Sequence, residues 1–307
     1  MGRIAADVTW LIGRTPLVEL ARLSPPGTRV LAKLEGDNPS GSNKDRAALG
    51  MIQDAERSGL LQQGGTIVEC SGGDLGVAIA MVGRRRGYRV VLTMPEWLAQ
   101  NRGNILRALG AEIVQTPAVE GMRGAMARAE QIARQTPGAL CLQAFTNRAN
   151  SRQHADTTAR EIWEDTDGQV QIVVCPVGTG GTAGGCCQFF QERNVAVVGV
   201  EPAGSRVLSG NMPGPHDIPG IGAGFVPEIL DARALTEVVA VEDQEAALGV
   251  RVLARDEAIL VGPASGAVIA AAVSIARRPA SNGKMIVAIL PDRGERYLDH
   301  RAFQPET

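Results

Sequence analysis

The residue best suited to covalent chemistry is Lys44, in the run Asn-Pro-Ser-Gly-Ser-Asn-Lys-Asp-Arg at residues 38–46. A strand-like apolar segment at residues 30–34 precedes this run, and we expect a helix to begin at the lysine. A lysine is normally favoured at the C-terminal end of a helix, so one in the first turn is electrostatically out of place. That position and desolvation both favour a neutral amine, which can act as a nucleophile or bind a carbonyl carbon. The alternative is an ordinary solvated surface lysine.

A glycine-rich turn is the second candidate. The sequence Gly-Thr-Gly-Gly-Thr-Ala-Gly-Gly at residues 178–185 follows an expected strand and opens the next helix. Glycines allow backbone N–H groups to converge on an anion at a helix N-terminus, and Thr179 and Thr182 add hydroxyl donors. A tight strand–helix junction with no ligand is the alternative. The spacing is not the GxGxxG of dinucleotide-binding folds, which disfavours that class.

The run around Lys44 resembles the cofactor-lysine motif of the cysteine synthases, which are fold type II pyridoxal-phosphate (PLP) enzymes. The glycine turn resembles the phosphate loop of that family. Three further segments resemble family motifs, in the same order and at compatible spacing: residues 13–18, 219–225 and 294–298. The resemblance therefore extends over nearly the whole chain.

The resemblance implies PLP as the cofactor, with Lys44 as its covalent anchor and as the base that moves the substrate α-proton. The cofactor-binding residues that it implies are Lys44, Asp74, Gly178, Thr179, Gly180, Gly181, Thr182 and Ser265. The substrate-binding residues that it implies are Ser71, Gly72, Gly73, Leu75, Ala144 and Gly222. The implied reaction is β-replacement on an O-activated serine, such as O-acetylserine, by a sulfide-like nucleophile. It would pass through an α-aminoacrylate to cysteine or an S-substituted analogue.

The substrate-carboxylate loop departs from the family pattern. Residues 71–76 read Ser-Gly-Gly-Asp-Leu-Gly where the family has Thr-Ser-Gly-Asn-Thr-Gly, so Gly72 and Leu75 each lack a hydroxyl. Asp74 replaces an asparagine that donates a hydrogen bond to the cofactor's phenolic oxygen, and an ionised carboxylate has no proton to donate. Ala144 stands where the family has a glutamine.

Near the C-terminus, Ala264 aligns with the serine that usually bonds the pyridine nitrogen. Ser265 could replace it, or could be a helix cap instead.

These departures leave two alternatives open. One is an enzyme of the same family with a different β-replacement or β-elimination substrate or nucleophile, and the other is a non-catalytic scaffold on this fold. Retention of Lys44 and of the phosphate loop counts against the scaffold.

Short β-branched runs alternate with helical patterns along the chain, which predicts an α/β fold with parallel-rich twisted sheets flanked by helices. The resemblance makes this architecture similar to the tryptophan synthase β-subunit. It implies a small domain at residues 40–147, a larger PLP-phosphate-binding domain formed by residues 1–39 and 148–307, and a cofactor between them. Expected helices include residues 44–59, 75–86, 121–135 and 154–165.

Composition narrows the function classes. The 307 residues carry a formal net charge of −2 and only 3% aromatics, which disfavours nucleic-acid partners, and no apolar run approaches the ~20 residues of a membrane span. The three histidines show no metal-ligand spacing, so we expect no metal site. Five scattered cysteines suggest buried free thiols in a reducing cytoplasm. The family resemblance implies that the protein is a homodimer.

Overall fold

The computed structural model describes residues 4–304, without the side chains of residues 100–102. The chain forms two compact units. One contains the described residues up to Ile12 together with Lys44–Asn150, and the other contains Gly13–Asn43 together with the residues from Ser151 onward. The functional division at residues 40–147 stays a prediction.

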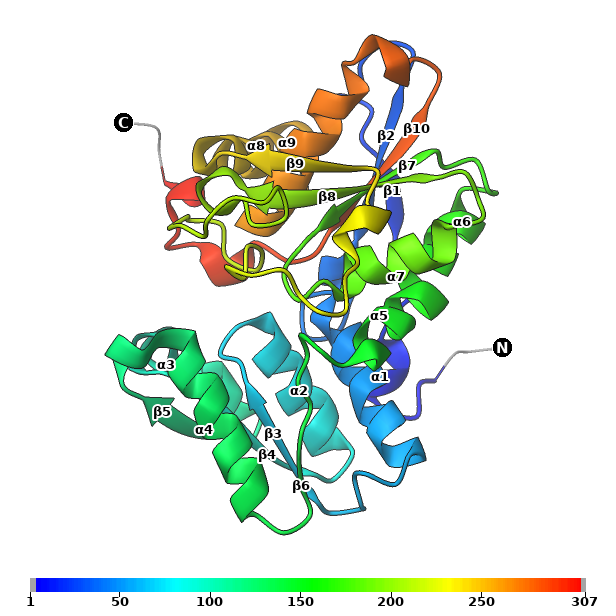
Figure 1. Cartoon of the computed structure of the whole chain (residues 1–307). Coiled ribbons are helices and arrows are strands. Elements are labelled where there is room, and N and C mark those ends of the chain that lie inside the picture. Colours follow the sequence, from blue (N-terminus) through cyan, green and yellow to red (C-terminus); the bar gives the residue numbers. More distant parts are fainter. Residues whose placement is uncertain (1–3, 305–307) are drawn as a thin grey trace. The chain divides into compact units, whose positions relative to one another are not determined.

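The first unit is built on a four-stranded parallel sheet (Figure 1). Its strand order is β5-β4-β3-β6, and the short β6 is an edge strand that pairs with β3. The bounds are β3 Thr66–Cys70, β4 Arg89–Pro95, β5 Glu112–Thr116 and β6 Ala139–Cys141.

Helices cover both faces of this sheet because alternate strand residues are apolar on each side. Ile67 faces one apolar cluster and its neighbour Val68 faces another. The first cluster contains residues of α1 (Lys44–Arg57), α2 (Asp74–Arg85) and α3 (Glu96–Ala108), and the second contains residues of α4 (Gly121–Gln135). Short 3-10 turns complete the unit: η1 Val8–Leu11 and η3 Ala118–Glu120.

The second unit holds a six-stranded sheet of order β1-β2-β10-β7-β8-β9, in which only the edge pair β1–β2 is antiparallel. The bounds are β1 Leu17–Glu19, β2 Arg29–Leu34, β7 Ile172–Pro176, β8 Ala196–Pro202, β9 Glu237–Val241 and β10 Met285–Leu290.

Both faces of the larger sheet are also covered. On one face, α8 (Asp243–Asp256) and α9 (Pro263–Ala276) pack together in an apolar cluster. Helices α6 (Arg160–Asp165) and α7 (Gly181–Phe190) contribute to the cluster on the other face. The adjacent residues Val173 and Val174 belong to different clusters, as expected for a strand buried on both sides. The remaining elements are α5 Arg148–His154, a π-helical turn Ala155–Ala159, and the 3-10 turns η2 Glu35–Asp37, η5 Ala203–Ser205, η6 Ala232–Ala234, η7 Pro279–Ser281, η8 Glu295–Tyr297 and η9 Arg301–Phe303.

The predicted α/β fold with parallel-rich sheets is confirmed. The single helix expected at 154–165 is different in detail, because a π-helical turn separates α5 from α6. In the described residues, no helix combines the length and the apolar character needed to cross a membrane, and no group of three metal-ligating side chains converges. All five cysteines are free thiols.

Candidate functional site

Lys44 is the first residue of α1, as the sequence predicted. The preceding residue, Asn43, is buried and anchored on both sides: its backbone N–H donates to Pro291 O at 2.9 Å, and its Nδ2 donates to Thr182 Oγ1 at 3.0 Å. The residue before the lysine is therefore held by its backbone at Pro291 and by its side chain at Thr182 of the glycine loop.

The glycine loop joins β7 to the N-terminus of α7. Gly180 has a left-handed φ of 84° and precedes the first helical residue, Gly181. A Cβ at Gly178 would lie 2.4 Å from Gly220 O, so a side chain cannot be accommodated there. Because the first N–H groups of a helix have no partner within it, this turn presents donors and a partial positive charge to an anion. The loop fits a phosphate group.

The second loop with predicted site residues lies in the first unit, between β3 and α2. Ser71 Oγ accepts a hydrogen bond from Gly76 N at 2.9 Å, which leaves the hydroxyl proton of Ser71 for another acceptor. A Cβ at Gly73 would meet no described heavy atom within 4 Å, so the loop borders open space there. Asp74 is the first residue of α2, where the helix dipole favours a negative side chain. The aspartate thus has a structural explanation independent of catalysis.

Two departures from the family pattern have clear packing causes. A Cβ at Gly72 would lie 2.7 Å from Leu98 Cγ and 2.9 Å from Met94 Sδ, so apolar side chains already occupy the space that a serine would need. Leu75 is 7% exposed and belongs to the apolar core of the first unit. Its side chain is part of that core, and any contact of Leu75 with a substrate would come from its backbone.

Ala144 is fully buried, and its carbonyl accepts a hydrogen bond from Asn150 Nδ2 at 2.9 Å. Gln143, the residue before Ala144, follows the end of β6 and has a positive φ of 54°. The sequence pattern does not predict this turn. The strand before it, β6, has only three residues, too few to show where it ends.

Glu69, at the end of β3, was not identified from the sequence. Its Oε1 accepts from Cys70 N at 3.0 Å, whereas its Oε2 has no hydrogen-bond partner among the described residues. Burial raises the pKa of the Glu69 carboxyl to about 7, and the backbone amides of Cys70, Gln143 and Ala144 only partly offset that effect. Glu69 and Gln143 both line a cavity of about 90 Å³ in the first unit.

Two predicted residues of the second unit lie in tightly constrained positions. Ser265 is the third residue of α9, behind the N-cap Gly262, and donates its hydroxyl to Asp292 Oδ1 at 2.6 Å. It is therefore not the helix cap. Gly222 has a φ of 68°, and a Cβ there would lie 2.6 Å from Pro202 Cγ. Only glycine fits this position without strain.

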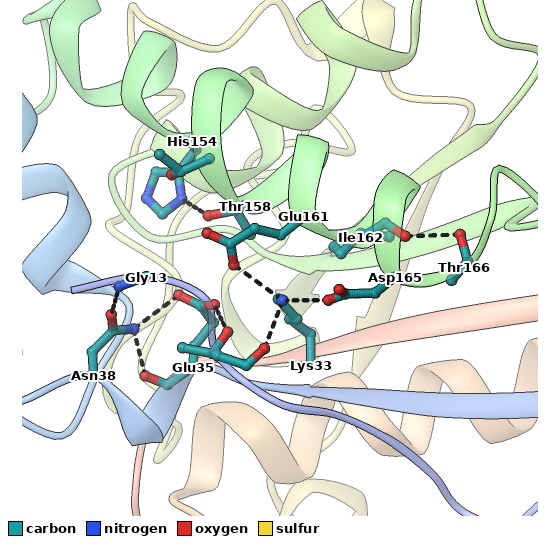
Figure 2. Close-up of polar contacts among 12 residues, drawn as sticks. Gly13, Lys33, Glu35, Asn38, His154, Thr158, Glu161, Ile162, Asp165 and Thr166 are labelled. Carbon is teal, nitrogen blue, oxygen red and sulfur yellow. Dashed lines mark hydrogen bonds and ion pairs between the residues drawn. The ribbon is translucent and has the colours of Figure 1, made fainter. Parts of the chain in front are cut away.

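A buried polar network, also not predicted, supports the segment before Lys44 (Figure 2). Lys33 Nζ is fully buried and contacts Glu161 and Asp165, each at 3.0 Å, and Thr15 O at 2.7 Å. Glu35 accepts from Thr15 Oγ1 at 2.6 Å and from Asn38 Nδ2 at 3.1 Å. The chain has three lysines, and one of them, Lys33, is held in these buried ion pairs.

The predicted residues thus form two groups. The first group lies in the first unit. It consists of the consecutive residues Ser71, Gly72, Gly73, Asp74 and Leu75 between β3 and α2, together with Lys44 and Ala144 elsewhere in that unit. The second group lies in the second unit and consists of Gly178–Thr182, Gly222 and Ser265. The individual roles of these residues stay predictions.

Comparisons with known proteins agree with the motifs. The family described as "Pyridoxal-phosphate dependent enzyme" matches residues 8–292. Cysteine synthase A of Escherichia coli K12 is 43% identical, over 99% of this chain and 97% of that protein.

Solved structures give the same result. A cysteine synthase of Entamoeba histolytica superposes with a TM-score of 0.95 at 38% identity, over 99% of this chain and 92% of that one. An O-ureido-L-serine synthase superposes with a TM-score of 0.94 at 39% identity, over 98% and 96%. The chain belongs to the cysteine synthase family of pyridoxal-phosphate-dependent enzymes.

Proposed function

We propose that this enzyme catalyses β-replacement on an O-activated serine with a sulfur nucleophile, so that cysteine or an S-substituted analogue is formed. The observation that carries the proposal is the hydrogen bond from the Asn43 side chain to Thr182, because it links the residue before the candidate lysine to the phosphate-type loop. A scaffold would need neither the lysine nor a loop built to receive an anion.

The proposed roles divide between the two loops and the lysine. The backbone N–H groups of the Gly178–Gly181 turn and the Thr182 hydroxyl hold the cofactor phosphate. Bound PLP supplies an electron sink that makes the substrate α-proton acidic. The Lys44 amine holds the cofactor, and when released it removes that proton from Cα and later returns it.

Recognition of the substrate carboxylate is proposed for the loop at Ser71–Gly76. The Ser71 hydroxyl has a proton to donate, and the N-terminus of α2 adds backbone donors. Gly73 borders open space, so a ligand can approach the backbone closely there. Backbone donors thus take the place of the hydroxyls that Gly72 and Leu75 lack.

A second candidate is the same reaction with a different nucleophile. The observation that favours it is the packing of Leu98 and Met94 against Gly72, which makes one side of the substrate loop apolar. The relative whose solved structure is described as an O-ureido-L-serine synthase shows that the fold accommodates a related reaction.

The experiment is a panel in which O-acetylserine is offered with sulfide and, separately, with larger or nitrogen- and oxygen-based nucleophiles, with products identified by mass spectrometry. We expect cysteine from sulfide, and no product with any nucleophile from the Lys44→Ala variant. Turnover with another nucleophile but not with sulfide would select the second candidate. Product from Lys44→Ala at the wild-type rate would refute both.

We also propose a cytoplasmic homodimer. Free thiols throughout the chain suit a reducing compartment. Trp10 and Leu11 are 74% and 57% exposed side by side, an apolar surface of the kind that subunit contacts cover. Light scattering on the purified protein tests the dimer, and a monomer at micromolar concentration would refute it.

A further inference from the structure

A buried chain of hydrogen bonds ends on Thr182 of the glycine loop. His154 is 1% exposed, and its Nδ1 lies 2.9 Å from Thr158 Oγ1 (Figure 2). The other ring nitrogen, Nε2, lies 3.4 Å from Thr182 Oγ1. Thr182 also accepts a hydrogen bond from Asn43 Nδ2 at 3.0 Å. The four side chains therefore form one continuous series within the second unit.

The local backbone is shaped for this contact. His154 is the last residue of α5, and the π-helical turn Ala155–Ala159 directly follows it. A Cβ at Gly185 of α7 would lie 2.5 Å from Ser151 O and 2.7 Å from His154 Cβ. Glycine at this position lets α7 approach the turn closely enough for Thr182 to meet the imidazole. π-Helical turns occur frequently at functional sites.

The protons that these groups can donate determine the direction of the hydrogen bonds from Thr158 to His154 and from His154 to Thr182. Among the described residues, His154 Nδ1 is the one hydrogen-bond partner of Thr158 Oγ1, and Thr158 is fully buried. The Thr158 hydroxyl proton therefore goes to Nδ1, because burying it without an acceptor costs free energy. Nδ1 is then the acceptor of a neutral ring, and the ring proton is on Nε2.

Thr182 Oγ1 then receives two donors, His154 Nε2–H and Asn43 Nδ2–H, which occupy both of its lone pairs. Its own proton is left for an acceptor outside this series. The alternative ring form, with the proton on Nδ1, would instead take the Thr182 proton at Nε2. The position of one proton on His154 thus decides whether Thr182 can donate to an anion.

We propose that His154 is a positioning residue that keeps the Thr182 hydroxyl proton directed toward the cofactor phosphate, and that Thr158 sets the ring form which makes this possible. The inference rests on the proposed phosphate-binding role of the Gly178–Thr182 loop. His154 touches neither substrate nor reacting atoms in this account.

The first test is nitrogen NMR of the holoenzyme with ¹⁵N-labelled histidine. The chain has three histidines, so a His154→Gln variant identifies the relevant signals. We expect a proton on Nε2 of His154 in the wild type. A ring protonated on Nδ1 alone would overturn the proposal.

The second test compares the affinities of the full-length chain, after cofactor removal, for PLP and for pyridoxal, which lacks the phosphate. Loss of one hydrogen bond predicts that Thr158→Val weakens PLP binding on the order of threefold to tenfold while pyridoxal binding is unchanged. Thr157→Val is the matched control, because the Thr157 hydroxyl donates to Gln153 O and does not reach His154. In a Thr182→Val background, Thr158→Val should have no further effect.

The outcomes separate the two claims. If Thr182→Val weakens PLP binding but Thr158→Val does not, or if Thr158→Val weakens PLP and pyridoxal binding equally, the role of His154 is refuted and the phosphate loop stands. If Thr182→Val leaves the affinity for PLP unchanged, the proposed phosphate contact fails, and the role of His154 fails with it.

Discussion

At the scale of single residues, the first unit contains ionisable side chains whose protonation depends on how deeply they are buried. Glu69 combines a buried carboxyl with an Oε2 that has no described partner, at the junction of β3 and the Gln143–Ala144 turn. Burial also raises the pKa of the nearby Cys70 and Cys141 thiols to about 12, so neither is a reactive nucleophile. Glu69 is therefore the residue of this region whose charge can change near neutral pH.

A stability prediction follows from Glu69. Its pKa is raised from 4.5 to about 7 in the folded chain. Between these values the unfolded chain ionises while the folded chain stays protonated, so the stabilising contribution is complete below pH 4.5 and is lost as pH rises to about 7. The loss is about 3 kcal/mol. Urea unfolding across this range should show a smaller decline for Glu69→Gln than for the wild type.

The matched control is Glu130→Gln, because Glu130 lines the same cavity but pairs with Arg134 and is 46% exposed. This variant should follow the wild-type pH dependence. Parallel curves for the wild type and Glu69→Gln would show that Glu69 is ionised in the folded protein and would contradict the prediction.

At the scale of elements, the loop at Ser71–Gly76 packs against α3 and the end of β4. Leu98 of α3 and Met94 at the end of β4 fill the space beside Gly72, which leaves no room for the serine of the family pattern. The departure at Leu75 is likewise matched by the core that surrounds it. These positions explain how the loop can lose side-chain hydroxyls and keep its backbone shape.

Restoring the family serine should therefore require two changes. Gly72→Ser alone overfills the contact with Leu98 and should lower the unfolding free energy by about 1–3 kcal/mol. Gly72→Ser combined with Leu98→Ala should recover most of that loss and raise kcat/KM for O-acetylserine above that of Leu98→Ala alone. Calorimetry and steady-state kinetics on the three variants measure both effects. A fully stable Gly72→Ser single variant would contradict the packing argument.

A second element-scale contact joins β2 to α6 through Lys33. Replacing Lys33 by methionine leaves Glu161, 15% exposed, without its buried cationic partner, and should cost about 3 kcal/mol of unfolding free energy. Arg29→Met is the matched control. Arg29 lies on the same strand as Lys33, its ion pair with Glu19 of β1 is exposed on both sides, and loss of that pair should cost under about 1 kcal/mol. Equal losses for the two variants, measured by urea unfolding, would refute the structural role of Lys33.

At the scale of the whole molecule, sequence reasoning succeeded where the relevant residues are neighbours in the chain. The start of α1 at Lys44 and the glycine turn before α7 were predicted because their signals are local. The contacts of Thr182 could not be predicted, since His154 and Asn43 lie 28 and 139 residues away in sequence. The i, i+4 spacing of His154 and Thr158 in the predicted helix was the available signal. It indicates that the two side chains meet, but not that they contact Thr182.

Three of the edge strands are hard to predict from the sequence for a related reason. β1, β6 and β9 are partly exposed and only three to five residues long, so their apolar patterns are too brief to distinguish from loops. The π-helical turn has no sequence signature of its own and replaced part of a predicted helix. Both features depend on packing against elements far along the chain.

If Lys44 holds the cofactor, the bond can be located directly, because the chain has only three lysines. Borohydride reduction of the holoenzyme makes the lysine–cofactor bond permanent, and peptide mass spectrometry then locates it. We expect the full label on the peptide that contains Lys44, and none on those with Lys33 or Lys284. A label on Lys284, or cofactor that is released intact after reduction, would contradict it.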